Sequence, residues 1–158
     1  MNVTTHPSAA WTLQQLREVI ADADEHKYLI HDPDGIFARH LDNSIRALGL
    51  TVLRSPFRSP KANAICERLI GTIRRECLGW MIPLSEAHLR SILREWVAHY
   101  NGERPHSALG PAVPGPPAGS TCAPKPDARR LWTPGALVRA KSVLGGLHHA
   151  YSLSPAVA

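Results

Sequence analysis

The stretch YLIHDPDGIFARHLDNSIRALGLTVLRSPFRSPKANAICERLIGTIRR, residues 28–75, decides the fold that we predict for this chain. Tyr28–Ile30 is too short an apolar run for a helix and indicates a buried strand. Apolar residues then recur every three or four positions over 38–48, which indicates a helix, and Leu50–Leu53 indicates a second strand. This order predicts a parallel pair of strands joined by a crossover, with functional groups at the carboxyl ends of the strands. Asp32 follows the first strand directly, so it is the first candidate functional residue.

Glu67 lies on the next predicted helix, 62–78, which follows a basic loop over 54–61. One face of this helix is apolar at helical spacing. That face consists of Ile65, Cys66, Leu69, Ile70, Ile73 and Cys77. Glu67 lies on the opposite face, so we expect its carboxylate to be exposed. Gly71, one turn further on, is explained equally well by close packing and by clearance for a bulky ligand beside Glu67.

Further elements are predicted on both sides of this stretch. A serine cap indicates a helix over 8–20, and an unbroken apolar face indicates a helix over 85–101. Six of the seventeen residues in 111–127 are proline, which indicates a linker without a packed core. Residues 136–140 and 143–151 read as short strands, the latter interrupted by two glycines in the manner of a hairpin turn.

The composition fits a globular chain of one domain plus an appendage, with 158 residues of which 44% are hydrophobic. No apolar run is long enough to span a membrane. The N-terminus also lacks the basic segment followed by an apolar segment that is typical of a signal peptide, so we expect a cytosolic location. The net charge of +5 is uneven: it is −3 over 1–53, +4 over 54–76 and +4 over 111–158. Such clustering favours a polyanionic partner over uniform solubilisation.

The cysteines and paired histidines do not form a recognisable metal motif. The three cysteines lack the short paired spacings of a zinc site. Cys66 and Cys77 are eleven positions apart on one helix face, which favours buried apolar roles over redox or metal roles. Cys122 lies in the proline-rich stretch and is expected to be a free thiol. His148 and His149 are adjacent in a predicted strand and therefore point to opposite faces, which argues against a shared metal ion.

Several motifs occur in an order that resembles a known family. They are LIHDPDGIF (29–37), SPFRSPKANAICERLIGTIRREC (55–77), HYNGERPHSALG (99–110) and, more weakly, VLGGLHHAY (143–151). Together they resemble the integrase catalytic core of DDE transposases and retroviral-type integrases, in particular bacterial insertion-sequence transposases. The resemblance implies a ribonuclease H-like α/β fold and DNA as the partner. It also implies three acidic side chains that hold two Mg²⁺ (or Mn²⁺) ions for cleavage and joining of phosphodiesters.

The resemblance assigns roles to residues of this chain. Asp32 matches the second acid, because Phe37 follows five positions later, and Asp34 is its competitor. Glu67 matches the third acid, although on its own it could equally be a surface acid paired with a neighbouring arginine. Residues expected to contact DNA phosphates are Arg54, Arg58, Lys61, Asn63, Arg68, Arg74 and Arg75.

The first acid of the family has no counterpart here, because residues 1–21 contain no Asp or Glu apart from Glu18. We therefore expect an N-terminally truncated core: a partial ribonuclease H-like fold that lacks its first strands, followed by C-terminal helices and a small β tail. The predicted domains are a partial integrase catalytic core over 1–110, a linker over 111–127 and a short β-hairpin tail over 128–158. Such a chain is expected to be marginally folded and inactive by itself.

The sequence thus predicts an integrase-core transposase fragment whose parent function is DNA integration and transposition. The alternative is a non-catalytic remnant that binds DNA or oligomerises through its basic helix and tail. A third interpretation, a small structural domain unrelated to DNA, predicts no salt-sensitive DNA affinity. The expected partners are DNA and a second copy of the chain. The expected location is the nucleoid, and no membrane association is expected.

Overall fold

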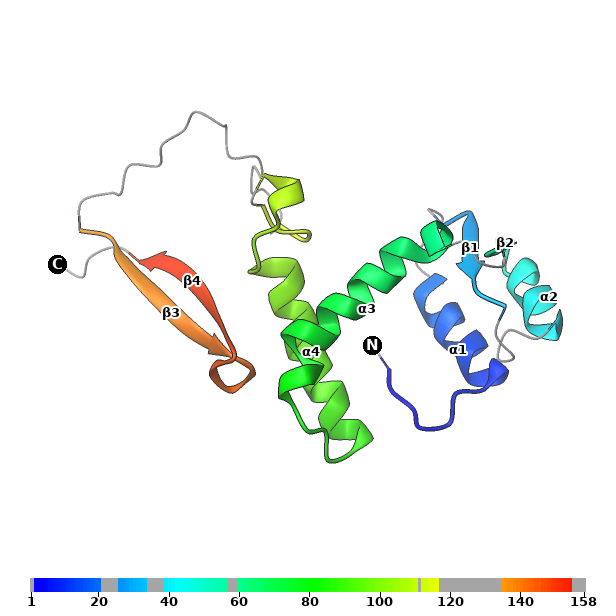
Figure 1. Ribbon diagram of the computed structural model, residues 1–158, viewed down its shortest axis with the longest axis horizontal. Coiled ribbons are helices and arrows are strands. Elements are labelled where there is room, and N and C mark those ends of the chain that lie inside the picture. The colour runs from blue at the N-terminus through cyan, green and yellow to red at the C-terminus, as the bar shows by residue number, and fades with distance from the viewer. Residues whose placement is uncertain are drawn as a thin grey trace. The chain divides into compact units, whose positions relative to one another are not determined.

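The computed structural model describes residues 2–20, 26–33, 39–56, 60–110, 112–116 and 135–154, in two compact units (Figure 1). The first unit comprises Asn2–Glu86 and the second begins at Ala87. No helix within the described ranges combines the length and apolarity needed to cross a membrane. Several predicted features lie outside these ranges: Asp34, Phe37, Arg58, Cys122 and most of the linker.

The first unit begins with the predicted capped helix, α1 (Ala9–Ile20). The hydroxyl of Ser8 accepts a hydrogen bond from the backbone N–H of Trp11 at 3.2 Å. The carbonyl of Ser8 accepts a second from the N–H of Thr12 at 2.9 Å. Because these bonds satisfy donors that the first turn leaves unpaired, the helix begins where the serine predicts it.

Strand β1 (Tyr28–His31), helix α2 (Arg39–Ala47) and strand β2 (Thr51–Arg54) follow in the predicted order. The two strands pair in parallel, with Leu29 opposite Val52, so the prediction of a parallel pair is confirmed. Helix α2 ends at Ala47, and Gly49 follows in the turn with a φ of +87°, the left-handed conformation that glycine adopts without a steric penalty. The chain can therefore reverse within a few residues and enter β2.

The core of this unit lies between α1, α2 and one face of the sheet. Leu41, Ile45 and Leu50 are buried, and Leu29 and Val52 pack against them together with side chains of α1. The described residues leave the opposite face exposed: Tyr28 is 63% exposed and Ile30 is 50% exposed. The prediction of a fully buried first strand was therefore wrong. Successive side chains of a strand point to opposite faces, and the described helices cover one of them.

A single turn of 3-10 helix, Pro60–Asn63, leads into α3 (Ala64–Glu76), and another, Leu78–Trp80, follows it. The prediction of a helix here is confirmed, but its apolar face is only partly buried, with Ile65 87% exposed and Cys77 fully buried. Cys66 is exposed, so its predicted burial was wrong, whereas that of Cys77 is confirmed. Helical spacing tells which side chains share a face, but a neighbouring element has to cover that face to bury it.

Helix α4 (Glu86–Gly102) contributes the buried Ile92 and Trp96, and a short 3-10 turn, Ser107–Leu109, follows it. Strands β3 (Leu137–Val143) and β4 (His148–Ser154) form an antiparallel hairpin. Two glycines with positive φ lie in the 3-10 turn between the strands, which confirms the predicted hairpin turn. Within this second unit, the carboxylate of Glu95 accepts a hydrogen bond from the backbone N–H of Leu144 at 2.5 Å. The rings of His99 and His148 stack with centroids 5.1 Å apart.

Candidate metal site and DNA interface

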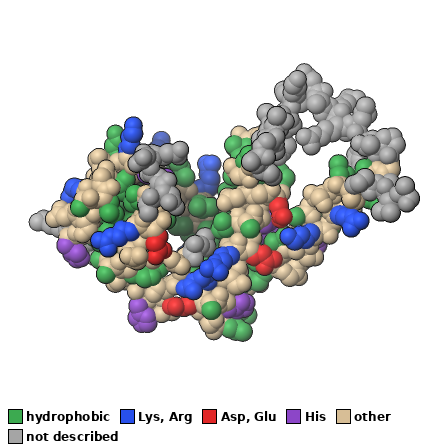
Figure 2. All heavy atoms as spheres, turned by 180° about the vertical axis from the view of Figure 1, so that it is seen from behind, with side chains coloured by type: hydrophobic (Ala, Val, Ile, Leu, Met, Phe, Trp, Pro, Cys, Tyr) green, Lys and Arg blue, Asp and Glu red, His purple; other side chains and the backbone are tan. Residues whose placement is uncertain are grey.

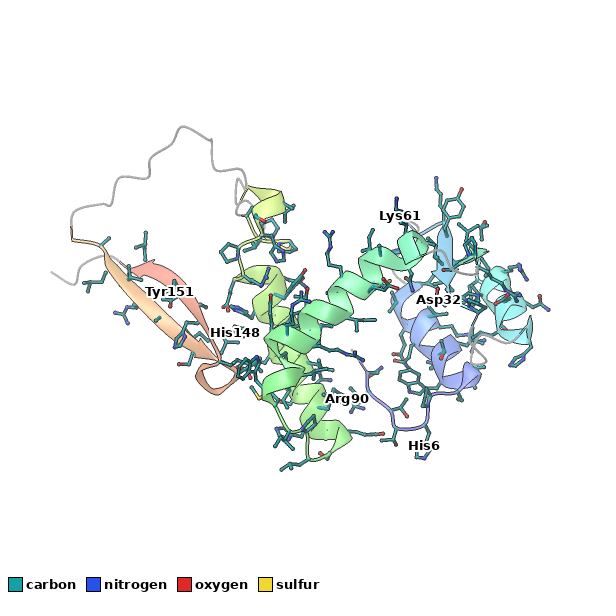
Figure 3. All side chains as sticks on the ribbon, viewed as in Figure 1. His6, Asp32, Lys61, Arg90, His148 and Tyr151 are labelled. Atoms are coloured by element: carbon teal, nitrogen blue, oxygen red, sulfur yellow. The ribbon has the colours of Figure 1, made fainter. Side chains whose placement is uncertain are left out.

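Asp32 lies directly after β1 and its side chain is exposed. The side-chain amide of Asn63 donates a hydrogen bond from Nδ2 to Oδ2 of Asp32 at 2.9 Å. Asn63 is the N-cap residue of α3, so this bond joins the carboxyl end of β1 to the beginning of α3. Figure 3 labels Asp32, after β1, and Lys61, in the turn before α3. Asn63 was expected to face DNA phosphates, and the structure shows that its amide binds the candidate carboxylate.

Glu67 lies in the first turn of α3 and is exposed. It follows Asn63 by four positions, about one helical turn, and side chains of a helix lean toward its N-terminus. The hydrogen bond between Asn63 and Asp32 therefore brings Asp32 to the beginning of α3, and Glu67 lies in the first turn of this helix. Two acids with 34 residues between them in the sequence thus lie on elements of one unit that this hydrogen bond joins.

Carboxylate and amide oxygens at this position form a donor set of the hard type that Mg²⁺ and Mn²⁺ prefer. Within the described ranges, no three His, Cys, Asp or Glu side chains gather closely enough to hold a metal ion. Two acids fit a cation that completes its coordination with water and phosphate oxygens, as Mg²⁺ commonly does. They do not by themselves form the three-acid set that holds a pair of ions. The alternative ligand, Asp34, lies outside the described residues.

Three side chains next to Asp32, those of His31, Asp42 and Arg54, form a network centred on the buried Asp42. Asp42 of α2 is 1% exposed and binds two residues that face it from the ends of the paired strands. Nε2 of His31 lies 3.1 Å from Oδ1 of Asp42, and Nε of Arg54 lies 2.9 Å from Oδ2. His31 and Arg54 are opposite each other in the register and share the sheet face that packs on α2.

Opposing effects act on the pKa of Asp42. Burial raises it, but hydrogen bonding and charge attraction from Arg54, and then from His31, outweigh burial and lower the pKa below its ordinary value. Asp42 is therefore ionised at neutral pH. Sequence reasoning missed this network, although one signal was available: Asp42 adjoins Leu41 and precedes Ile45 by three positions, which places it beside the buried face of α2.

Arg54 was expected to contact DNA, and in the structure its guanidinium is bound to Asp42 while about half of the side chain remains exposed. Lys61 and the three arginines of α3 are exposed. We call these arginines, Arg68, Arg74 and Arg75, the α3 arginines. Over the visible face in Figure 2, Lys and Arg side chains are interspersed with other types and do not gather in one patch.

Gly71 has a close neighbour on its own helix. A Cβ at this position would lie 3.2 Å from Nη1 of Arg75, whose other terminal nitrogen donates to Oγ1 of Thr72 at 3.4 Å. The space beside Gly71 is therefore used by an arginine side chain. This favours packing, one of the two explanations of Gly71, over clearance for a ligand.

Comparison with known proteins identifies related chains. Residues 48–114 match the family model described as integrase core domain. The chain is 38% identical over 79 residues to the insertion element IS407 uncharacterized 31.7 kDa protein of Burkholderia multivorans, covering 49% of this chain and 28% of that protein. It is also 38% identical over 65 residues to the putative transposase InsD for insertion element IS2E of Escherichia coli, covering 41% of this chain and 30% of that one. The chain thus spans less than a third of each of these relatives.

Among solved structures, the chain is similar to one in the simian T-cell lymphotropic virus intasome in complex with PP2A regulatory subunit B56 gamma. The TM-score is 0.51 at 12% identity, over 95% of this chain and 55% of the other. At this identity the similarity concerns the fold alone. Together with the family match, it confirms the predicted ribonuclease H-like α/β class. Residues 48–114 thus match the integrase core domain, and the chain is similar to proteins of bacterial insertion elements, transposases among them.

Proposed function

We propose that Asp32 and Glu67 form part of a divalent-cation site in an integrase-core transposase, whose function is DNA integration by phosphodiester cleavage and strand transfer. The hydrogen bond between Asn63 and Asp32 carries this proposal, because it brings the strand end and the helix that bear the two acids together. In this proposal residues 1–110 act as the catalytic-core segment, 111–127 as a linker and 128–158 as a β-hairpin tail.

Divalent cations are generally used by enzymes of this family, and the oxygen donors of Asp32 and Glu67 suit Mg²⁺ or Mn²⁺. A bound ion would polarise a phosphate oxygen and make a bound water or hydroxyl a better nucleophile. Asn63 donates to one oxygen of Asp32 and thereby orients the carboxylate, and in this proposal the other oxygen binds the cation. Glu67 supplies a carboxylate from the neighbouring turn of the helix.

DNA binding is proposed for the positive segment around Glu67. The exposed α3 arginines, Lys61 and the exposed part of Arg54 are candidates for phosphate contacts, and Arg58 is a candidate from the sequence alone. Guanidinium groups bind phosphate oxygens bidentately and do not read bases, so this contact would position DNA without selecting a sequence. With DNA as the partner, the expected location is the cytoplasm, in association with the nucleoid.

We expect no strand transfer from this chain by itself. Two carboxylates retain a pair of cations less well than three, and the described residues offer no third acid at the site. A Mn²⁺-dependent assay on DNA ends measures this directly. Joining of DNA ends by the purified chain would contradict the expected inactivity.

A second candidate function is non-catalytic DNA binding combined with oligomerisation. It is favoured by the exposed apolar side chains on β1 and α3, since such surfaces mark interaction sites. These side chains are Tyr28, Ile30, Ile65, Leu69 and Ile70. In this alternative the cation site is absent, and the chain associates with DNA and with other copies of itself.

The Glu67→Gln substitution separates the two functions. It keeps the size of the side chain and removes the charge needed to bind a cation. We expect Mn²⁺ affinity, measured from the electron paramagnetic resonance signal of free Mn²⁺, to fall by about tenfold or more, while DNA retention in a gel-shift assay is unchanged. The matched control is Glu18→Gln, at an exposed glutamate of α1. Equal Mn²⁺ binding by the two variants would refute the metal site and favour the alternative.

A further inference from the structure

We infer that His31 is a positioning residue that fixes the backbone of Asp32. This inference rests on the proposed cation site. His31 is the last residue of β1 and is 4% exposed, whereas Asp32, the next residue, is exposed. The two residues lie at the boundary between the buried network and the candidate site. Because His31 and Asp32 are neighbours in the chain, a contact that fixes His31 also limits the conformations of Asp32.

The imidazole of His31 is held at both ring nitrogens. Nδ1 lies 2.8 Å from the backbone carbonyl oxygen of Asp32, and Nε2 lies 3.1 Å from Oδ1 of Asp42. Both partner atoms are oxygens that accept hydrogen bonds, one from the backbone and one from a carboxylate. The ring is thus held between two fixed oxygens, which restricts its rotation.

The anchor of this bridge belongs to other elements of the unit. Asp42 is fixed on α2 and is bound by Arg54 at the end of β2. The backbone of His31 is also held, because its carbonyl accepts the N–H of Ser55 at 2.9 Å. The ring of His31 therefore connects the carbonyl of Asp32 to a buried ion pair instead of to solvent.

Holding the carbonyl of Asp32 restricts rotation about its ψ angle. Pro33 restricts the same residue from the other side, because a residue before proline is excluded from the helical region. With its backbone held, Asp32 presents its carboxylate to Nδ2 of Asn63 in one direction. The role of His31 is thus to orient a ligand, since its own ring is buried and binds neither cation nor DNA.

The test uses His31→Phe, which keeps the ring shape and removes both ring nitrogens, and Ile45→Val as a control that weakens the same core without touching the network. The first measurement is the side-chain amide resonance of Asn63 in the metal-free full chain by ¹⁵N-correlated NMR. We expect His31→Phe to move it to the position of a solvated asparagine and Ile45→Val to leave it in place. An unmoved Asn63 resonance in His31→Phe would overturn the inference.

The second measurement is Mn²⁺ affinity. Loss of a residue that orients a ligand typically weakens metal binding by about 10- to 100-fold, so we expect at least a tenfold loss in His31→Phe and less than about twofold in Ile45→Val. Equal affinities in the two variants would also overturn the inference. If Asp32→Asn leaves the Mn²⁺ affinity of the chain unchanged, the proposed cation site fails, while the Asn63 resonance still decides the role of His31.

A third measurement covers the case in which His31→Phe does not fold. The variant His31→Gln keeps a polar side chain in the network but lacks the ring that spans from Asp42 to the carbonyl of Asp32. We expect it to move the Asn63 resonance to the position of a solvated asparagine. An unmoved resonance in His31→Gln would overturn the inference.

Discussion

Replacing Asp42 by asparagine removes the charge at the centre of the buried network while keeping the shape of the side chain. Asp42 accepts from Nε2 of His31, in a side chain 3% exposed, and from Arg54, in a side chain 49% exposed. Removing one partner of a fully buried pair costs about 3–5 kcal/mol. That range is an upper bound here, because about half of the Arg54 side chain remains in contact with water.

The expected cost follows from the remaining bonds. A buried hydrogen bond to a charged group contributes about 1.5–3 kcal/mol, which applies to the bond with His31. The half-exposed bond with Arg54 contributes less, about 0–1 kcal/mol. We therefore expect Asp42→Asn to lower the unfolding free energy of the first unit by about 2–3 kcal/mol at neutral pH.

The destabilisation caused by Asp42→Asn depends on pH, and the pKa of Asp42 determines whether it grows or shrinks as the pH falls. The ordinary pKa is 3.8 and the folded value is lower, so the unfolded state binds the proton more readily. The stabilisation by the charged group is complete above about pH 4 and is lost as the pH falls through the folded pKa. The difference between the unaltered chain and Asp42→Asn should therefore shrink below pH 4.

Urea unfolding at pH 7 and pH 3, followed by circular dichroism, measures this difference. Hydrogen exchange of peptides from β1, α2 and β2 assigns it to the first unit. The control is Asn43→Ala, at the adjacent exposed position, for which we expect a change within about 0.5 kcal/mol. The reasoning is refuted if Asp42→Asn costs no more than this control at pH 7, or if its cost is equally large at pH 3.

Three further predictions concern other parts of the chain. Replacing the α3 arginines by alanine should weaken DNA binding and reduce the slope of log affinity against log salt by about 2–3, measured by fluorescence anisotropy; an unchanged slope would exclude these residues from the interface. Ile45→Ala should cost about 2–5 kcal/mol in urea unfolding, because this fully buried side chain lies in the core of the first unit, and a cost below about 1 kcal/mol would show that the core is loosely packed. Glu95→Ala should speed hydrogen exchange in β3 and β4 by removing the acceptor for the N–H of Leu144, whereas Arg94→Ala should not; equal exchange in both variants would show that the hairpin does not depend on this bond.

Local features of this chain could be predicted because the responsible interactions are short in range. Ser8 begins α1 through bonds to residues three and four positions away, and Gly49 reverses the chain just after α2 through its own backbone conformation. The parallel pairing of β1 and β2 was also predictable, because a crossover helix leaves few alternatives. Asp32 at the end of β1 followed from this local pattern.

Burial could not be predicted in the same way. The spacing of Tyr28 and Ile30, and that of Ile65 and Cys66, shows which side chains share a face, yet these four are exposed. Whether a face is buried depends on which other elements pack on it. That information is not contained in the periodicity of a single segment.

The sequence by itself determined the order and type of the elements, the ends of the helices and the positions of the two candidate acids. The tertiary structure decided which polar groups meet: Asn63 with Asp32, and Asp42 with His31 and Arg54. These partners are 11 to 31 positions apart. Contacts at such distances require particular directions of the strands and helices, because a hydrogen bond tolerates only a few tenths of an ångström, and it is folding that sets these directions.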